Sequence, residues 1–249
     1  MNILVCISQV PDTTTRIRFT DNKKEIETAG IQWVINPWDE LSLTRALELK
    51  EQSAGKIGKV AVAHVGPVSS DAVIRKALAI GADEAYRVDA APIDAFQVSA
   101  ELSAMIKGKD FDLILCGIDS SDYNGSAVGG MLAEWLEIPS VSAISGIDIE
   151  NGELRITRDI DGGKQQLMVD GAFVGIVQKG IAKEPRIAAM RGIMQARTKP
   201  IHVIPASTGD ALTQVLGFEA SEPREACRFV DAEEAEKLIV ILQQETKLI

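Results

Sequence analysis

Short apolar runs rich in Val, Ile and Leu alternate with segments of helical spacing through the first two-thirds of the chain. Runs that are apolar at every position are typical of strands buried on both faces of a parallel sheet. The predicted strands are Ile3–Ile7, Val60–Val65, Glu84–Val88 and Leu113–Cys116, and the predicted helices begin at Asn36-Pro37 and cover Ser70–Ala79, Ile93–Lys107 and Ala127–Leu136. This alternation predicts a three-layer α/β/α fold around a mostly parallel sheet.

Alternating strands separated by turn residues replace this pattern after the fourth predicted helix. Asn151-Gly152 stands between Asp148–Glu150 and Leu154–Thr157, and Asn-Gly is typical of a two-residue hairpin turn. Asp161-Gly162-Gly163 forms a second turn before Gln165–Val169. We therefore expect antiparallel strands to be added to the parallel sheet.

Two further segments lie outside the alternation. Near the N-terminus, Arg16–Phe19 and Glu25–Glu27 flank a polar turn and predict a hairpin insertion. Near the C-terminus the sequence is rich in turn residues, and only Ala232–Gln243 has a helical pattern. We expect a nucleotide-binding α/β domain over residues 1–200 and, over residues 201–249, a C-terminal arm with a terminal helix that packs on another subunit.

Composition and charge narrow the function classes. Apolar residues make up 46% and charged residues 25% of the chain, as in a globular protein rather than a disordered one. The net charge of −10 argues against a nucleic-acid partner, which needs a basic surface. No charged leader precedes the first predicted strand, and no apolar run is long enough to span a membrane. The sequence therefore predicts a cytoplasmic protein.

Cysteine and histidine are too sparse for a metal centre. Cys6 and Cys116 lie in apolar runs and are expected to be small buried side chains, and Cys227 stands far from both. Their spacing predicts neither a disulfide framework nor a zinc site. The two histidines, His64 and His202, are isolated from one another in the sequence. We expect no metal ligands.

The segment Gly117–Gly130 is the best candidate for a binding site. It follows a predicted parallel strand, contains glycines and hydroxyl side chains, and leads into a helix. Ligands of open α/β sheets bind at this edge, and backbone N–H groups at a helix N-terminus can hold a phosphate. The segment matches neither the dinucleotide nor the Walker fingerprint, so the alternative of an ordinary turn-rich loop stays open.

Three other segments should reach the same edge of the sheet. Ser8–Asp12 follows the first strand, Val65–Pro67 follows the second, and Asn36–Asp39 begins the first helix, where Asn is expected to cap and Pro suits the first turn. Nothing near them forms a nucleophile elbow, a nucleophile–histidine pair or an isolated acid pair. We therefore expect no catalytic residues.

The segment Glu184–Pro200 is basic within an acidic chain. Arg186 and other cations are interleaved with apolar residues that include Met190 and Met194. One interpretation is a helix with a solvated basic face. The other is a docking surface, because exposed methionine adapts to different partners.

Taken together, these segments resemble the beta subunit of the electron transfer flavoproteins. The matching pieces occur in the family's order over about residues 1–200. They are Gln9-Val10-Pro11-Asp12, Asn36-Pro37-Trp38-Asp39-Glu40, Val65-Gly66-Pro67, Leu78-Ala79-Ile80-Gly81-Ala82-Asp83, the loop from Gly117, Thr157-Arg158-Asp159-Ile160-Asp161-Gly162-Gly163, and Glu184-Pro185-Arg186 through Lys199-Pro200.

The resemblance implies a Rossmann-like fold of the adenine-nucleotide-hydrolase type and a heterodimer with an alpha subunit. It implies a non-enzymatic carrier that passes electrons between an acyl-CoA-type or other flavin dehydrogenase and a downstream acceptor, through FAD shared with alpha. It also implies an AMP, or in bifurcating members a second FAD, in this subunit. The implied cofactor-binding residues are Cys6, Asn36, Pro37, Trp38, Asp39, Val65, Gly117, Ile118, Asp119, Ser120, Ser121, Asp122, Tyr123, Asn124, Gly125, Ser126, Ala127 and Val128, and the implied partner-recognition residues are Glu184, Pro185, Arg186, Met190 and Met194.

The chain departs from the family's pattern in the loop itself. Ile118-Asp119 stands where the family usually has a lysine–glutamine pair, and Ala127-Val128 where it has glutamine–threonine. Gly130 replaces a proline, and Gln195 and Thr198 replace lysines near the recognition segment. Side-chain donors for a phosphate are therefore missing, and AMP, a second FAD and a stand-alone nucleotide sensor remain alternatives.

Overall fold

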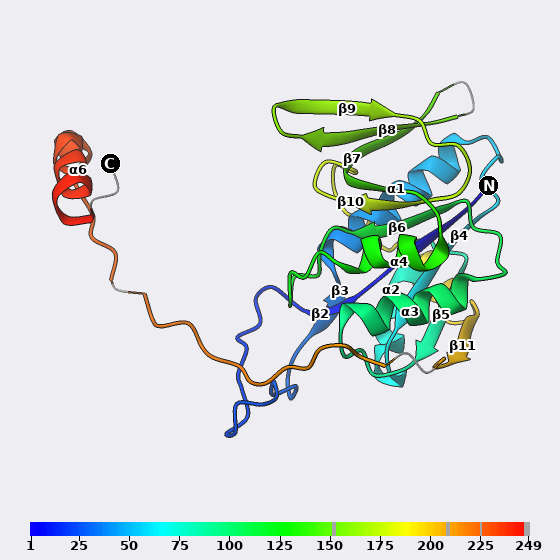
Figure 1. The fold of residues 1–249 in the computed structure, drawn as a ribbon, viewed down its shortest axis with the longest axis horizontal. Coiled ribbons are helices and arrows are strands. Elements are labelled where there is room, and N and C mark those ends of the chain that lie inside the picture. The colour runs from blue at the N-terminus through cyan, green and yellow to red at the C-terminus, as the bar shows by residue number, and fades with distance from the viewer. Residues whose placement is uncertain (151–152, 208–209, 225, 247–249) are drawn as a thin grey trace.

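The computed structural model describes residues 1–150, 153–207, 210–224 and 226–246. In these residues nine strands form one sheet, mostly parallel, with helices on both faces (Figure 1). The strands are β1 (Asn2–Cys6), β4 (Lys59–Val65), β5 (Glu84–Asp89), β6 (Leu113–Gly117), β7 (Ser140–Glu150), β8 (Glu153–Ile160), β9 (Gly163–Leu167), β10 (Phe173–Val177) and β11 (Ile201–Pro205). The helices are α1 (Pro37–Gln52), α2 (Asp71–Ile80), α3 (Ala95–Ile106), α4 (Val128–Leu136), α5 (Met190–Ala196) and α6 (Ala235–Ile241). The predicted three-layer, Rossmann-like fold is confirmed.

The strand order is β11-β5-β4-β1-β6-β10-β7-β8-β9. From β1 the chain builds outward through β4 and β5 and then returns to the other side of β1 to form β6. The order therefore reverses between β1 and β6, and a crevice at the carboxyl ends of these strands is the usual ligand site of an open α/β sheet.

Two apolar clusters, one on each face, hold the layers together. One joins alternate residues of the strands to α1 and α2, with Leu43 and Leu78 fully buried. The other joins the opposite faces of the same strands to α3 and α4, with Leu132 fully buried. Strands buried on both faces explain the uninterrupted apolar runs in the sequence.

The antiparallel additions are confirmed, since β7 pairs with β8 and β8 with β9 in antiparallel registers. The predicted turn Asn151-Gly152 lies outside the described residues. β10 enters the sheet between β6 and β7, and β11 extends the other edge beside β5, both parallel to their neighbours. The sequence interpretation assigned neither strand, and β11 covers the first residues of the predicted arm.

The N-terminal insertion contains the predicted hairpin in a short form and a second antiparallel pair of strands at its base. Its short antiparallel strands are β2 (Gln9–Pro11) and β3 (Trp33–Ile35). Of the residues predicted to pair, Phe19 and Ile26 form an isolated antiparallel bridge. Polar and charged residues dominate this segment, so it has little apolar surface with which to stabilise longer strands.

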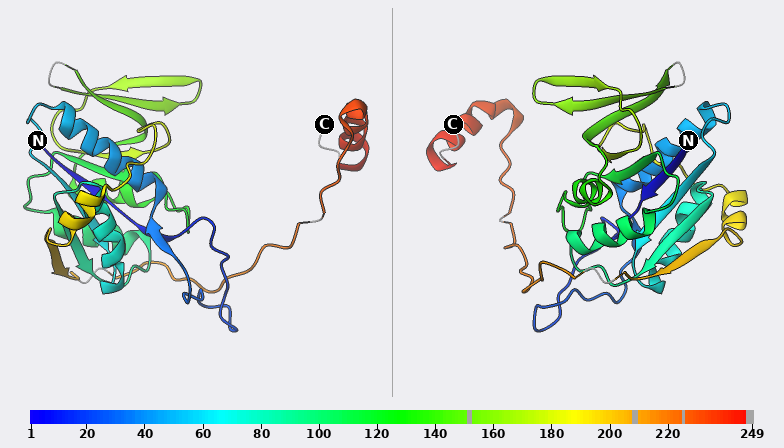
Figure 2. Two further views of the ribbon diagram at one scale, coloured as in Figure 1. Left: turned by 180° about the vertical axis from the view of Figure 1, so that it is seen from behind. Right: turned by 45° about the vertical axis from the view of Figure 1, so that its right-hand side comes forward.

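The C-terminal arm leaves the α/β body and carries α6 away from the sheet (Figures 1 and 2). The root of the arm is tied to α3 by hydrogen bonds: the backbone N–H groups of Leu212 and Thr213 donate to Asp94, at 2.7 and 2.8 Å. Phe218 stacks on Phe19 of the insertion, with ring centroids 5.3 Å apart. The predicted terminal helix is present as α6, preceded by a 3-10 turn and followed by a π turn.

Candidate functional site

The predicted binding loop begins where the strand order reverses. Gly117 ends β6, and the backbone N–H of Ile118 still donates to the Val177 carbonyl of β10 at 2.8 Å. The chain then leaves the sheet and returns at α4, which begins at Val128. Ser8, directly beyond β1, and the first turn of α1 lie beside this exit, so three of the predicted segments meet at one edge.

Asp39 of α1 joins the ends of β1 and β6. One carboxylate oxygen accepts from the Ser8 backbone N–H at 2.7 Å and from its hydroxyl at 3.0 Å. The other accepts from the Gly117 N–H at 2.9 Å. Asp39 is 2% exposed, so the sheet edge is organised around a buried carboxylate whose donors are Gly117 at the end of β6 and Ser8 in the segment after β1.

The pKa of Asp39 is raised from 3.8 to about 6, because burial disfavours the charged carboxylate. The hydrogen bonds from Ser8 and Gly117 oppose this effect by stabilising the ionised form. Burial outweighs them, and the carboxyl group is therefore placed to change charge in mildly acidic solution.

Gly117 has no room for a side chain. A Cβ atom at this position would lie 2.4 Å from the nearer Asp39 carboxylate oxygen and 2.7 Å from Cβ of Trp38. The close approach brings the Gly117 N–H within reach of Asp39. Glycine is thus required here by contact with α1, whatever the loop binds.

Asn36 ties the loop to the start of α1. Its side-chain amide donates to the Asp119 carbonyl at 2.8 Å, and its side-chain oxygen accepts from the Ser121 N–H at 3.2 Å. The predicted N-cap is therefore wrong in its chemistry: Asn36 stands at the N-cap position but makes no side-chain capping bond, because its amide is used by the loop. Pro37 occupies the first turn as predicted.

The loop itself presents carboxylate, hydroxyl and backbone groups. The Asp119 side chain has a buried oxygen without a hydrogen-bond partner among the described residues. Asn124 and Ser126 have φ values of +49° and +48°, a conformation that costs energy for residues other than glycine. The sequence from Gly117 to Gly130 contains no Lys, Arg or His. A phosphate held here would rely on backbone N–H groups ahead of α4.

The remaining predicted site residues line the side of the loop or project from it. Cys6, Val65 and Val128 belong to the apolar cluster under α3 and α4. Tyr123 is exposed at the loop surface, and Asp122 accepts from the Tyr123 N–H. Ser120 accepts through its carbonyl from the Asn124 N–H. Gly125 and Ala127 complete the loop before α4.

Comparison with known proteins decides the family. The model of the electron transfer flavoprotein domain matches residues 24–208. The chain belongs to the electron transfer flavoprotein family. It is 33% identical over 220 residues to an electron transfer flavoprotein subunit beta of Syntrophomonas wolfei, covering 88% of this chain and 85% of the relative. It is 30% identical to subunits of the same name from Bacillus subtilis, over the whole of both chains, and from Homo sapiens, over 98% of this chain and 97% of the relative.

Members of this family are electron transfer proteins. In the described ranges, no group of three or more His, Cys, Asp and Glu side chains could hold a metal ion. Among the same residues, no helix combines the length and apolar character of a membrane span.

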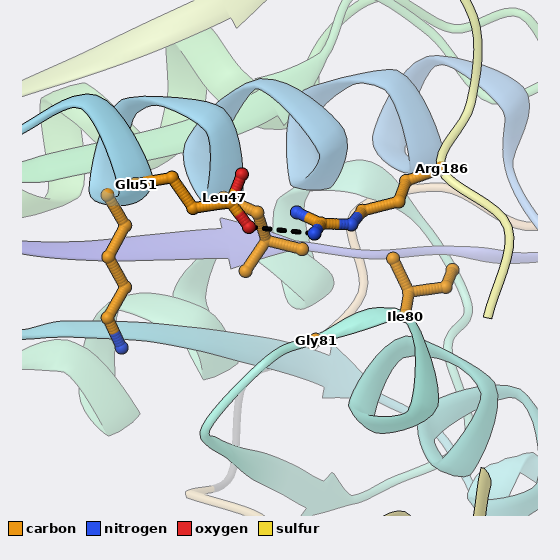
Figure 3. Close-up of a pocket in the computed structure, with 6 residues that line it drawn as sticks. Leu47, Glu51, Ile80, Gly81 and Arg186 are labelled. Atoms are coloured by element: carbon orange, nitrogen blue, oxygen red, sulfur yellow. Dashed lines mark ion pairs between the residues drawn. The ribbon is translucent and has the colours of Figure 1, made fainter. Parts of the chain in front are cut away.

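Arg186, in the segment predicted for partner recognition, lies between α1 and the C-terminal end of α2 (Figure 3). The Arg186 backbone N–H donates to the Thr44 hydroxyl at 2.9 Å, and its guanidinium pairs with Glu51 at 2.7 Å. Arg186 closes one side of a pocket of about 360 Å³, lined also by Leu47, Lys50, Glu51, Ile80 and Gly81.

The large apolar side chains of this segment are exposed. Ile187 is 90% exposed and Met190 74% exposed, and Met194 is also exposed. Glu184 and Pro185 lead into the segment on the exposed surface. This segment is separate from the Asp39–Gly117 site, so the two predicted groups of residues form two surfaces rather than one.

Sequence reasoning missed a polar cluster beside the site. His64 on β4 is buried, and its Nδ1 lies 2.9 Å from the Ile7 carbonyl, which can only accept. Nδ1 therefore carries the proton, and the lone pair of Nε2 has no hydrogen-bond partner among the described residues. Arg87, its neighbour on β5, donates to the Gly66 carbonyl and pairs with Asp71 at 2.9 Å. The sequence signal that could have revealed this cluster is the presence of a polar residue, His64 or Arg87, at a core-facing position in each of two neighbouring strands.

Proposed function

We propose that this chain is the beta subunit of a heterodimeric electron transfer flavoprotein. It would bind an alpha subunit and pass electrons from a flavin dehydrogenase to a downstream acceptor through FAD held with alpha. The observation that carries the proposal is the match, over most of both chains, to relatives named as beta subunits. The FAD would supply the electron-carrying chemistry, and this chain would supply a rigid wall and a docking surface.

The nucleotide proposed for this subunit is AMP, at the edge organised by Asp39. Asn36 holds Asp119 and Ser121 in place by hydrogen bonds, so the loop has a defined shape. The unpartnered Asp119 oxygen fits a ribose hydroxyl, which donates to carboxylates in many nucleotide sites. The phosphate would lie at the backbone N–H groups ahead of α4, where the helix dipole favours an anion. The residues present therefore fit an adenosine group better than they fit a polyphosphate.

The dehydrogenase is proposed to dock on the segment from Glu184 to Met194. Met190 and Ile187 offer exposed apolar contact, and the Arg186–Glu51 ion pair fixes the start of the segment on α1. Exposed methionine suits a surface that must accept several partners. The arm, with exposed Ile239 on α6, is proposed to pack on the alpha subunit.

Reduction of the complex by a dehydrogenase tests this function. The chain is co-expressed with its alpha subunit, and flavin absorbance is followed after addition of an acyl-CoA dehydrogenase and its substrate. Met190→Asp should slow reduction strongly and leave flavin content unchanged. Arg158→Ala, a change on the distant β8 strand, serves as the control and should leave the rate unchanged. A folded complex that never retains flavin would contradict the proposal.

One observation favours a second candidate, a stand-alone adenine-nucleotide sensor. The hydrogen bonds of Asp39 and Asn36 that shape the site join segments of this one chain, and a sensor would bind its nucleotide with these groups alone. Calorimetric titration of the isolated chain with AMP separates the two functions. The sensor predicts the same affinity with and without alpha. The electron-carrier function predicts instead a complex with alpha that contains flavin. A second FAD in place of AMP in that complex would indicate the bifurcating type.

A further inference from the structure

The two cysteines in the sheet are direct neighbours beneath the proposed nucleotide site. β1 and β6 run parallel with Val5 opposite Leu115, so one residue further in the same register Cys6 stands opposite Cys116. Both side chains belong to the cluster on the α3 and α4 face. Cys6 is 7% and Cys116 3% exposed. The sequence places them 110 positions apart, and the fold turns them into a dithiol.

The Cys116 thiol affects the ionisation of Cys6. Hydrogen bonding to Cys116 is the largest cause that raises the pKa of Cys6 well above its usual value, followed by burial. Cβ of Cys116 would lie 3.4 Å from a Cβ atom at Gly129, so the first turn of α4 covers Cys116 closely. The high pKa of Cys6 and the burial of both thiols keep the reduced pair slow to react.

The geometry also allows a disulfide. Neighbouring strands lie about 4.8 Å apart, within the range of roughly 4.4–6.8 Å between Cα atoms that disulfides span. Side chains in register on parallel strands stand side by side, however, and a disulfide must draw their Cβ atoms together. A bond formed in this way is strained, and strained disulfides are readily reduced again.

A bond at this place would act on the nucleotide site. Gly117 directly follows Cys116, and Ser8 follows Cys6 by two residues. Their N–H groups donate to the two oxygens of Asp39, at 2.9 and 2.7 Å. A disulfide would draw β1 and β6 together at Cys6 and Cys116, next to these donors. It would therefore change the distance between the Ser8 and Gly117 N–H groups and the position of the first residues of the Gly117 loop.

We propose that Cys6 and Cys116 form a redox-sensitive dithiol that a peroxide converts to a disulfide, loosening the Asp39–Gly117 anchor of the binding loop. One thiolate attacks hydrogen peroxide, giving a sulfenic acid and releasing hydroxide. The second thiol then displaces the sulfenic oxygen as water and forms the S–S bond. In total two thiols and one peroxide yield one disulfide and two waters. The effect on a bound adenylate, unlike the bond itself, rests on the proposed function.

The test uses the full chain with Cys227→Ser, which removes the exposed third thiol. After hydrogen peroxide treatment, intact-mass and peptide analysis should show a Cys6–Cys116 disulfide, the loss of two hydrogen atoms, and full reversal by dithiothreitol. Cys6→Ala and Cys116→Ala in the same background are matched controls and should not lose two hydrogen atoms. The peroxide exposure that oxidises Cys227 in the unaltered chain serves as the reference. If Cys6 and Cys116 both remain free thiols after ten times that exposure, the proposal is overturned.

Hydrogen exchange tests the link to the loop without any nucleotide. In the oxidised chain the amides of Ser8 and Gly117 should exchange about tenfold faster than in the reduced chain. Unchanged exchange in a fully oxidised sample would overturn the link. AMP should bind about tenfold more weakly to the oxidised chain. If AMP binds neither the reduced nor the oxidised chain, the proposed nucleotide is contradicted. The proposed dithiol is then judged from the mass analysis and the hydrogen exchange alone.

Discussion

Asp39 is the residue on which the proposed site depends, because its carboxylate connects β1, β6 and α1. Burial raises its pKa from 3.8 to about 6, so between these pH values the folded chain binds a proton that the unfolded chain releases. This group therefore adds stability as the pH falls from 7 toward 4, by about 3 kcal/mol at most. His64 acts in the opposite direction, since burial lowers its pKa and acid favours the unfolded chain.

The first prediction isolates the contribution of Asp39. Asp39→Asn should lower the free energy of unfolding at pH 7 by about 1–3 kcal/mol, because an amide turns a donor toward Ser8 or Gly117. The difference from the unaltered chain should widen as the pH falls toward 4. Urea unfolding of both chains at several pH values measures this. A pH-independent difference would contradict the raised pKa of Asp39.

The second prediction concerns the close approach at Gly117. Gly117→Ala places a methyl group 2.4 Å from an Asp39 oxygen, so α1 and β6 must separate. We expect a loss of about 1–3 kcal/mol in stability and weaker AMP binding. Gly125→Ala, where a Cβ atom would meet open space, is the matched control and should change stability little. Thermal unfolding and AMP titration of both variants provide the measurement.

The sequence predicted which segments meet at the site but not how their side chains are used. Asn36 carries the signature of a helix cap, yet its amide is taken up by Asp119 and Ser121, more than eighty residues away. Local sequence shows local partners only. The Cys6–Cys116 pair was hidden for the same reason, because strand register brings the two residues together across the whole first half of the chain.

At the scale of elements, α5 is fastened to α2 by reciprocal capping. Arg75 of α2 donates to the Ala196 and Lys199 carbonyls, at 2.7 and 2.6 Å, and Lys199 donates to the Leu78 and Ala82 carbonyls, at 3.0 and 2.5 Å. Cationic side chains at helix C-termini satisfy carbonyls that have no partner within the helix. These contacts fix the base of the proposed docking segment while its large apolar side chains are exposed.

The third prediction tests this junction. A Cβ atom at Gly192 would lie 2.3 Å from the Ala79 carbonyl oxygen, a backbone atom that cannot rotate away. Gly192→Ala should lower the free energy of unfolding by about 1–3 kcal/mol and slow reduction by the dehydrogenase. Met194→Ala on the exposed face of the same helix should leave stability unchanged. Equal melting temperatures for both variants would contradict the close packing.

Elements with uninterrupted apolar or helical patterns were predictable, whereas edge and inserted strands were not. β11 is half exposed and short, so its sequence resembles a loop until β5 supplies its hydrogen bonds. β10 is as apolar as β6, but the turn-rich hairpins before it concealed its place in the parallel sheet. Tertiary pairing rather than local preference determines both strands.

At the scale of the whole molecule, the arm has an anchored root and a distal part that extends from the body. Asp94 caps α3 through the Gln97 N–H and also accepts from Leu212 and Thr213 of the arm. These hydrogen bonds hold the pKa of Asp94 below its usual value, and the bond from the Gln97 N–H has the largest effect. Their contribution is present at neutral pH and is lost as the pH falls through the lowered pKa.

The fourth prediction is that Asp94 directs the arm. Asp94→Ala should remove exchange protection of the Leu212 and Thr213 amides and weaken association with the alpha subunit. Asp122→Ala, which removes only a local bond to Tyr123, is the control and should change neither the protection nor the association. Hydrogen exchange and a heterodimer titration measure the two effects. Full protection of both amides in Asp94→Ala would show that other contacts hold the root.

Native mass spectrometry of the complex co-expressed with the alpha subunit tests the central proposal most directly, because it reports subunits and ligands together. We expect one alpha subunit, one copy of this chain, one FAD and one AMP, with AMP retained by this chain when the subunits are separated. An isolated chain that forms no complex with alpha, or a complex that carries no flavin, would contradict the account.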